Sequence, residues 1–477
     1  MPLIIAVTLA CGGVGAIVAN GGMKGLVAVA GAGALAGGLM LVRERERFVL
    51  VVTVMTIQFM LHKAFGPIDE TVASGASAIY VTSLDALVVL LFALWIADGT
   101  FVEDLRKAFS SRIMLVPLLP IALSIPSLFV ASNVLVALAE LVRMAWMYGL
   151  FVYVATRVRT REDVGWVVAA LFAVAVLQGA IVVAQWRTGG LLGLSFLGEE
   201  QGTFLRTLDE SEVVRPSGTV IHPDLLAALV GPIGLLGLAL AMDLRRGILR
   251  IVALAGAVTA FVPLALSHTR AALAALAVAT LLLVLWYTVR GRLRRDVLFG
   301  FVALSAVATI YFWPTLQEGV FDTLTTDHFK LEVEARLQLN GIALAMMSAS
   351  PLVGIGLNNF MTAFDSFDLY GVIYPGFPAH NLYLIVFAET GILGFIGLVA
   401  VLYAFLRVAL HVASAPDRFL GAVGGAMAVG FVFLLVEELL SFSLRGDIPS
   451  ALYWLMAGLC VACARIVDSE RLEAAHA

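Results

Sequence analysis

Charged residues are scarce in this chain of 477 residues. They make up 13% of the sequence, whereas a soluble globular domain carries about 25%. Hydrophobic residues make up 61%, and a water-soluble fold cannot hide that much apolar surface. The composition therefore excludes both soluble folds and disorder. A formal net charge of −4 also argues against a nucleic-acid partner.

Cysteine and the common catalytic motifs are scarce or missing as well. Cys11, Cys460 and Cys463 all lie in apolar stretches, so we expect neither a disulfide framework nor a zinc site. The chain lacks a P-loop and a G-x-S-x-G motif, and no D-x-D motif occurs in its long polar segments. The acidic run at 199–212 offers a cation site, but most such runs are simply solvated. We therefore expect no metal and no cofactor.

Long hydrophobic runs take the place of these features. A membrane-spanning helix needs about 20 apolar residues, and hydropathy predicts about fourteen of them. The first two are rich in Gly and Ala, so twelve or thirteen is the alternative. The fold class is thus an all-α polytopic membrane protein with about 12–14 transmembrane helices. The candidate spans are 3–19, 25–42, 48–62, 79–97, 113–132, 133–156, 164–186, 218–242, 248–267, 270–289, 297–314, 380–410, 418–442 and 448–466.

Basic residues predict the orientation of these spans. Lysine and arginine concentrate on the cytoplasmic side of membrane proteins, and here the basic loops fall on one side of the predicted membrane. Both termini are then cytoplasmic. The residues concerned are Arg43, Arg45 and Arg47; Arg106, Lys107 and Arg112; Arg157, Arg159 and Arg161; Arg245, Arg246 and Arg250; and Arg290, Arg292, Arg294 and Arg295, together with the 407–418 loop and the C-terminal tail.

Two predicted external segments are long, and such segments are usually functional or structured. The first, 187–217, is acidic, and the second is the loop 315–379. Within that loop, residues 328–349 are typical of an amphipathic helix that ends before Pro351. A stretch rich in aromatic residues follows, with Phe360, Phe364, Phe367, Tyr370, Tyr374 and Phe377.

Some basic residues depart from the orientation rule and lie outside. Arg215 and Arg270 stand at the outer starts of predicted helices, and Arg336 lies on the amphipathic segment. Because guanidinium binds phosphate with a planar fork of donors, arginines on one rim predict an anion site. Contact with lipid headgroups is the alternative. The external basic residues are Lys24, Lys63, Arg187, Arg206, Arg215, Arg270, Lys330, Arg336 and Arg445.

His380 opens a predicted membrane helix directly after the aromatic stretch. A helix N-terminus disfavours the imidazolium, so the neutral side chain is favoured. This form suits a general base that accepts a proton from a hydroxyl. The alternative is a helix cap, with Asn381 sharing the capping.

Glu389 lies in the same predicted helix, nine residues after His380. This spacing puts the carboxylate about 13 Å deeper and on the opposite face, so a direct His–Glu pair is not expected. A buried carboxylate still needs a partner. We expect Glu389 to tie its helix to a neighbouring element, with a functional role as the alternative.

Other charges lie within or near the predicted spans. Glu140 and Arg143 are three residues apart, which favours a structural ion pair on one helix face; a substrate or proton path is the alternative. Glu437 and Glu438 are candidates to pair with Arg445.

Several motifs in residues 215–400 resemble those of one family. Residues 351–360 (P-L-V-G-I-G-L-N-N-F) resemble its P-L-x-G-x-G-x-x-N-F block, and 380–394 resemble its H-N-x-x-L followed by E-x-G-x-x-G. Residues 267–272 (S-H-T-R-A-A) resemble its S-x-[ST]-R-[GA]-A helix start. Residues 215–224 resemble its R-x-x-G and N-P segment, with Asp224 where asparagine is common. The family is the O-antigen ligase and polymerase superfamily.

The resemblance implies a metal-independent glycosyltransferase with a GT-C-like fold in the bacterial inner membrane. Such enzymes move a glycan from a polyprenyl diphosphate carrier to a glycan, glycolipid or protein acceptor outside that membrane. The resemblance also implies other proteins that assemble envelope polysaccharide as candidate partners. The essential residues correspond to His380, Arg270 and Arg336, and Arg215 is a further candidate that we assign to substrate binding. We add Asn381, His222, Arg445 and Glu389 as candidate substrate-binding residues.

The same resemblance divides the chain. Residues 1–214 form the N-terminal transmembrane helices and the acidic external loop. Residues 215–467 form the catalytic membrane region, including loop 315–379, and residues 468–477 form a cytoplasmic tail. Whether the enzyme is a ligase or a polymerase stays open. The rival functions are a transporter or flippase for a lipid-linked saccharide and a non-catalytic component of a polysaccharide export complex.

Overall fold

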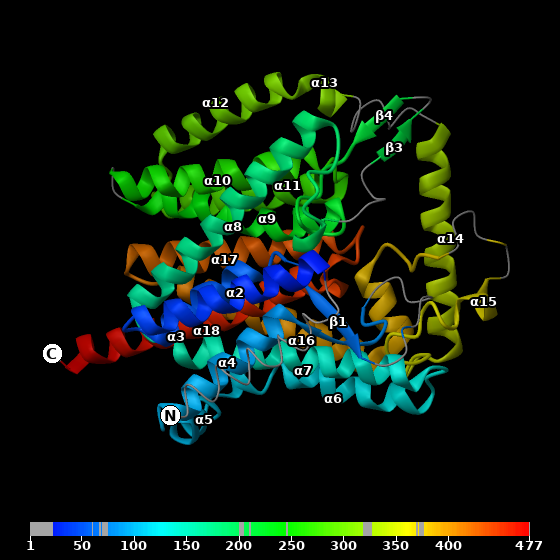
Figure 1. Ribbon diagram of the computed structural model, residues 1–477, viewed down its shortest axis with the longest axis horizontal. Coiled ribbons are helices and arrows are strands. Elements are labelled where there is room, and N and C mark those ends of the chain that lie inside the picture. The colour runs from blue at the N-terminus through cyan, green and yellow to red at the C-terminus, as the bar shows by residue number, and fades with distance from the viewer. Residues whose placement is uncertain are drawn as a thin grey trace.

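The computed structural model consists largely of helices that run side by side along the long axis of the molecule (Figure 1). The predicted first span at 3–19, with Cys11, lies outside the described residues, as do Tyr370 and Tyr374. The structure describes residues 22–59, 61–65, 68, 75–199, 205–208, 211–244, 247–317, 327–368, 371 and 376–476.

Eight of the described helices are long and apolar enough to cross a membrane. Helix α4 (Ser83–Ala97) and helix α5 (Phe101–Ala108) are bent by 107° and make a ninth span if they are counted together. The prediction of an all-α polytopic membrane protein is therefore confirmed. The eight helices are α7 (Val134–Arg157), α8 (Arg161–Thr188), α9 (Pro223–Asp243), α10 (Ile248–Leu266), α11 (Arg270–Val289), α16 (Leu382–Ala413), α17 (Arg418–Glu437) and α18 (Asp447–His476).

The described helices include fewer full-length spans than the twelve to fourteen predicted from hydropathy. Several predicted spans are short or interrupted helices. Helix α3 (Arg45–Thr56) has 12 residues, which cover about 18 Å of a hydrocarbon layer about 30 Å thick. Prolines confine α6 to Leu118–Ser124 and a following 3-10 turn to Ile125–Phe129. Helix α12 (Arg295–Tyr311) has 17 residues, and the 20-residue helix α2 (Gly22–Leu41) is not among the eight helices counted above.

Two small antiparallel hairpins interrupt the helical fold. Strand β1 (His62–Phe65) pairs with β2 (Ile79–Thr82), and β3 (Leu205–Leu208) pairs with β4 (Ser211–Val214). The predicted spans 48–62 and 79–97 overlap the two strands of the first hairpin, and β2 (Ile79–Thr82) consists of β-branched and aromatic residues that favour a strand. The hairpins connect helices and form no larger sheet in the described part of the chain.

The predicted cytoplasmic loops meet at one end of the helix bundle, which we call the basic end. Arg157 binds Glu46 (2.6 Å) and Asp104 (3.1 Å), and Arg161 binds Asp417 (2.9 Å). These ion pairs join loops that are far apart in the sequence, in agreement with the prediction that they share one side of the membrane. The identity of that side as cytoplasmic stays a prediction.

Helix α14 (Asp327–Ala349) crosses the opposite end of the bundle, which we call the α14 end (Figure 1). It occupies the predicted amphipathic segment and ends before Pro351, as expected. Its apolar face packs with the short helix α15 (Phe364–Phe367) and the start of α16 to form a core of its own. The buried positions of this face repeat at helical spacing: Ala335, Leu339, Ile342, Ala343 and Met346.

Helix α16 is broken at Gly391, and the loop 351–356 fills the break. Gly391 has φ 63°, and Gly354 in the loop has φ 71°. Each backbone lies so close to the other that neither position has room for a Cβ atom. The loop satisfies the backbone groups that the broken helix leaves free. The hydrogen bonds run from Ile355 N to Ala388 O (2.9 Å), from Gly356 N to Glu389 O (3.0 Å) and from Ile392 N to Pro351 O (2.9 Å).

We predict that Gly391→Ala destabilises the protein by at least about 1–2 kcal/mol, because a left-handed conformation costs an L-residue this much. The added Cβ atom would also lie 2.3 Å from the carbonyl carbon and oxygen of Leu352. Thermal unfolding in detergent should show a lower Tm. The control is Gly300→Ala in α12, where a Cβ atom meets open space and should not lower the Tm. An unchanged Tm for Gly391→Ala would contradict the strained geometry.

Candidate functional site

Glu332 brings together the two arginines that the sequence singled out most strongly. Its Oε2 accepts a hydrogen bond from Arg270 Nη2 at 2.8 Å, and its Oε1 accepts one from Arg336 Nη2 at 3.0 Å. Arg270 is the first residue of α11, and Arg336 and Glu332 lie one turn apart on α14. The guanidinium of Arg270 also lies over the ring of Phe329, 4.7 Å from its centroid. Helix α14 therefore docks on the start of α11 through this group.

The sequence analysis missed Glu332. The signal was present, because a carboxylate four residues before an arginine on a helix commonly pairs with it. The contact with Arg270 joins residues 62 positions apart, and no local pattern predicts it. All three charged side chains are between 21% and 33% exposed, so a ligand can reach them.

Arg215 binds the segment that precedes α11. Its Nε donates to Ser267 O at 3.0 Å and its Nη2 donates to Asp224 Oδ1 at 3.1 Å. Thr269 Oγ1 donates to the same Asp224 oxygen at 2.8 Å. His222 caps α9 by accepting from Asp224 N at 3.2 Å, and burial lowers the pKa of His222. Arg215 and His222 thus lie at one cluster, and Asp224 offsets much of the charge of Arg215.

Two buried glutamines of α8 hold the neighbouring turn in place. Gln185 accepts from Gly218 N (2.9 Å) and donates to Gly218 O (3.0 Å), while Gln178 accepts from Thr219 N (3.2 Å). Gln185 also donates to Glu199 at 2.7 Å. Glu199 belongs to the acidic run, for which a solvated surface was the main expectation, yet it is 2% exposed. This carboxylate is structural, because it joins the end of α8 to the following loop.

His380 lies within electrostatic range of Arg336, and its imidazole is neutral at pH 7. Burial, together with the positive charge of Arg336, lowers the pKa of His380 to about 4. The negative charges of Asp224 and Glu332 oppose this shift but do not cancel it. Among the described residues, His380 Nδ1 has no hydrogen-bond partner although it is buried. The ring lies against Phe442, with 5.2 Å between centroids.

Asn381 performs the capping that was the alternative role for His380. It is the N-cap residue of α16, and its Oδ1 accepts from Leu384 N at 3.1 Å. Its Nδ2 donates to Leu439 O at 3.1 Å, which ties the helix start to the turn after α17. Because Asn381 caps the helix, the imidazole of His380 is left for another role.

Arg445 and Glu389 form a buried ion pair. Arg445 Nη1 lies 2.7 Å from Glu389 Oε2, and the side chains are 6% and 2% exposed. Arg445 also donates to Asn358 Oδ1. The prediction that Glu389 ties its helix to a neighbouring element is confirmed. The pairing of Arg445 with Glu437 or Glu438 was wrong, since its partner is in a different helix; a substrate-binding role for the pair stays a prediction.

Glu140 and Arg143 pair on one face of α7, as predicted, with 2.6 Å between Glu140 Oε1 and Arg143 Nη2. Both residues, together with Glu389 and Arg445, line a cavity of about 130 Å³ between α7 and α16. Two ion pairs therefore line a cavity whose remaining walls are mostly apolar side chains. Such pairing is required there, because an isolated charge is costly in an apolar interior.

Glu437 and Glu438 are both fully buried and share one serine. Ser443 Oγ lies 2.8 Å from Glu437 Oε2 and 2.6 Å from Glu438 Oε1. Leu444 N donates to the same Glu438 oxygen at 2.7 Å. Ser443 therefore ties both carboxylates to the short 3-10 helix at Ser443–Arg445.

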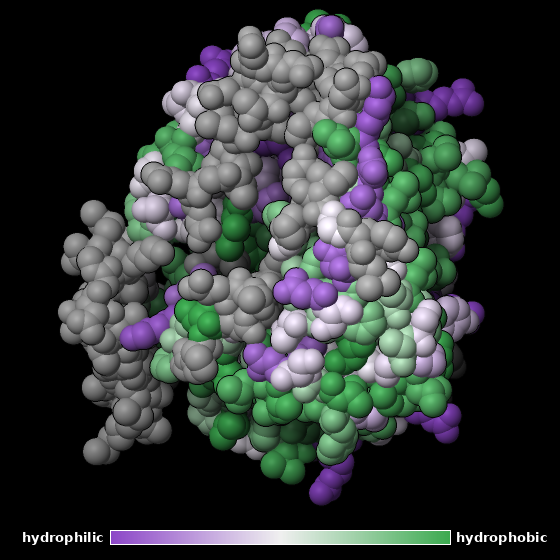
Figure 2. Space-filling model, turned by 90° about the vertical axis from the view of Figure 1, so that its right-hand side faces the viewer, coloured by the Kyte–Doolittle hydropathy of each residue, from purple (hydrophilic) through white to green (hydrophobic). Residues whose placement is uncertain are grey.

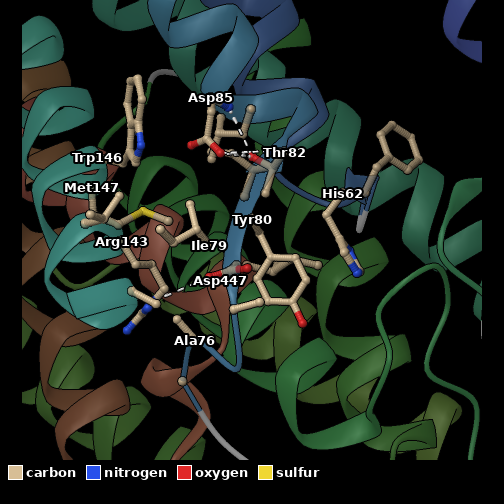
Figure 3. Close-up of a pocket in the computed structure, with 18 residues that line it drawn as sticks. His62, Ala76, Ile79, Tyr80, Thr82, Asp85, Arg143, Trp146, Met147 and Asp447 are labelled. Atoms are coloured by element: carbon tan, nitrogen blue, oxygen red, sulfur yellow. Dashed lines mark hydrogen bonds and ion pairs between the residues drawn. The ribbon is translucent and has the colours of Figure 1, made fainter. Parts of the chain in front are cut away.

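A second cavity of about 70 Å³ also has Arg143 in its lining (Figure 3). Arg143 points toward Asp447 there, with 3.6 Å between Nη1 and Oδ1. Asp85 and Thr82 form the capping box of α4. The charged groups of this cavity are thus engaged in ion pairing and capping, and none of the predicted site residues lines it.

The α14 end is therefore the candidate functional site. Figure 2 shows this end of the molecule, where hydrophilic side chains gather between hydrophobic areas. The residues assembled here come from the starts of α9, α11 and α16 and from α14. They combine a neutral imidazole with guanidinium groups that a ligand can reach, an arrangement that suits an anionic substrate with a hydroxyl acceptor.

We predict that breaking the Arg445–Glu389 pair costs about 3–5 kcal/mol of stability, because one buried charge is left without its partner. Arg445→Met and Glu389→Leu should each lower the Tm in detergent, and the double variant should lose less than the sum. Arg407→Gln, at an exposed position of α16, is the control and should leave the Tm unchanged. A normal Tm combined with lost activity in Arg445→Met would instead support substrate binding.

One family model matches the segment that contains most of this site. The model is described as O-antigen ligase, and it matches residues 255–399. Among curated proteins, no match to the chain was found. The matched segment includes Arg270, Glu332, Arg336 and His380, and Arg445 lies outside it. The resemblance is thereby confirmed: residues 255–399 of this polytopic membrane protein match the O-antigen ligase family.

Proposed function

We propose that this protein is a membrane glycosyltransferase that moves a glycan from a polyprenyl diphosphate carrier to an acceptor hydroxyl. The observation that carries the proposal is the grouping of a neutral His380 with Arg336 and Arg270 inside the segment that matches the O-antigen ligase family. In this proposal the basic end faces the cytoplasm, and the α14 end faces the outside of the bacterial inner membrane.

The arginines act on the donor. A diphosphate is a good leaving group once its developing charge is neutralised, and fixed guanidinium groups supply that neutralisation without reorganisation. Arg270 and Arg336 approach the same carboxylate from two helices, so they are placed to bind one anion together. The planar fork of each side chain matches the oxygens of a phosphate.

His380 acts on the acceptor. Its imidazole accepts the proton of the acceptor hydroxyl while the hydroxyl oxygen forms a bond to the anomeric carbon. The bond between this carbon and the diphosphate oxygen breaks, and its electron pair leaves with the carrier diphosphate. A single displacement of this kind inverts the configuration at the anomeric carbon. The aromatic residues near the site, including Phe377 and Phe442, offer surfaces for sugar rings.

The natural acceptor can be identified by deleting the gene and separating the glycolipids of the resulting strain on a gel. Loss of all polymer from the lipid A core identifies a ligase. A core that carries one repeat unit identifies a polymerase. A wild-type glycolipid pattern would count against both activities.

We predict that His380→Ala lowers transfer by at least about 10²-fold, the usual contribution of a general base. The assay uses the purified protein with lipid-linked glycan and detects the new glycosidic bond. His411→Ala is the matched control, because His411 lies on the same helix at the basic end, where it binds Asp468. Wild-type transfer by His380→Ala would reject the proposed base.

The pH dependence of kcat/KM should report the lowered pKa of His380. In the folded protein the pKa of His380 is about 4, whereas an unperturbed histidine has a pKa of about 6.5. We therefore expect activity to persist to about pH 5. Arg336→Gln removes a positive charge that disfavours the imidazolium, so its acid limb should move to higher pH. Arg161→Gln, at the basic end, changes the net charge equally and should leave the limb in place. A wild-type acid limb near pH 6.5 would contradict the structure.

A further inference from the structure

Glu332 occupies the position that the proposed function assigns to the donor's diphosphate. We propose that Glu332 is an internal competitor of the carrier diphosphate: it holds Arg270 and Arg336 while no donor is bound and displaces the carrier after transfer. The inference rests on the proposed function and adds a step to it. Binding of the diphosphate requires the carboxylate to release the two guanidinium groups, and product release returns it to them.

The geometry of Glu332 is that of a bridging anion. Each of its two carboxylate oxygens contacts a different arginine, at 2.8 Å and 3.0 Å. A phosphate presents its oxygens to guanidinium forks in the same way. The carboxylate and an incoming phosphate therefore compete for the same donors, and both cannot hold them at full strength.

The charges of the cluster favour exchange over permanent pairing. Two guanidinium groups meet one carboxylate here, so the cluster retains positive charge that attracts a more highly charged anion. Glu332 is 21% exposed, and water can solvate it when it leaves the arginines. A carboxylate paired as deeply as Glu389, which is 2% exposed, would lose far more on separation.

The chemistry of the transfer explains why such a competitor is useful. The donor's diphosphate carries one ionisable oxygen on each phosphate, because both of its ends are esterified. After transfer the product ends in a free phosphate, which has a second ionisable oxygen with a pKa of about 6. The product is therefore more negative than the donor and binds the arginines more tightly. A carboxylate that returns to the arginines offsets this product binding.

A purely structural role for Glu332 predicts the opposite result. If the carboxylate only orients the guanidinium groups, its removal disorders them and weakens the binding of every anion. If it competes, its removal strengthens anion binding. The sign of the change in affinity therefore separates the two roles.

The test measures the binding of inorganic pyrophosphate to the purified full-length protein by calorimetry, with Glu332→Gln as the main variant. We expect the variant to bind pyrophosphate about tenfold more tightly, since it loses charged competing contacts. In transfer assays, KM for the donor and kcat should both fall, because release of the carrier becomes slow. A second variant, Glu332→Ala, should change affinity in the same direction. Glu334→Gln, an exposed carboxylate on the same helix, is the control and should match the wild type.

Equal or weaker binding of pyrophosphate by both Glu332 variants would overturn the inference. The variant Arg270→Gln separates this failure from failure of the proposed function. If Arg270→Gln weakens pyrophosphate binding while the Glu332 variants do not strengthen it, the arginine site stands and only the competitor role is rejected. If Arg270→Gln leaves the affinity unchanged, the arginines are not the phosphate site, and both proposals are rejected.

Discussion

The insertion of loop 351–356 into the break of α16 is the contact on which the α14 end depends. In an apolar environment a broken helix must have its free backbone groups satisfied by protein, and this loop supplies the hydrogen bonds. The loop directly follows α14, which carries Arg336, and α16 directly follows His380. The same contact therefore sets the position of the arginine helix relative to the histidine. Gly354 and Gly391 make it possible, because their backbones approach more closely than a Cβ atom allows.

Burial separates the charges of this protein into two groups. Deep in the bundle, Arg445 pairs with Glu389 and Arg143 with Glu140, and all four are at most 14% exposed. The first pair joins α16 to the turn before α18, and the second lies within α7; each charge has a partner because an unpaired charge there is too costly. At the α14 end, Arg336 is 33% exposed and shares a carboxylate. Guanidinium groups in this second environment can exchange one anion for another at low cost.

Much of this molecule could be predicted from local patterns. The amphipathic spacing of 328–349 predicted a helix that the structure contains, and the three-residue spacing of Glu140 and Arg143 predicted their ion pair. For the number of spans, hydropathy predicted more than the eight or nine long apolar helices found among the described residues. It sums the apolar content of a window and is insensitive to the turns and prolines that shorten a helix such as the one at Leu118–Ser124.

The sequence by itself determined the membrane class, the starts of the major helices and the motifs that carry His380 and Arg270, because composition and short-range periodicity act within one segment. Only the tertiary structure decided that Arg445 binds Glu389, that Asn381 rather than His380 caps α16, and that Glu332 bridges two arginines. Most of these contacts join side chains from different helices. Their partners are chosen by how the helices pack, and the packing depends on the whole chain at once.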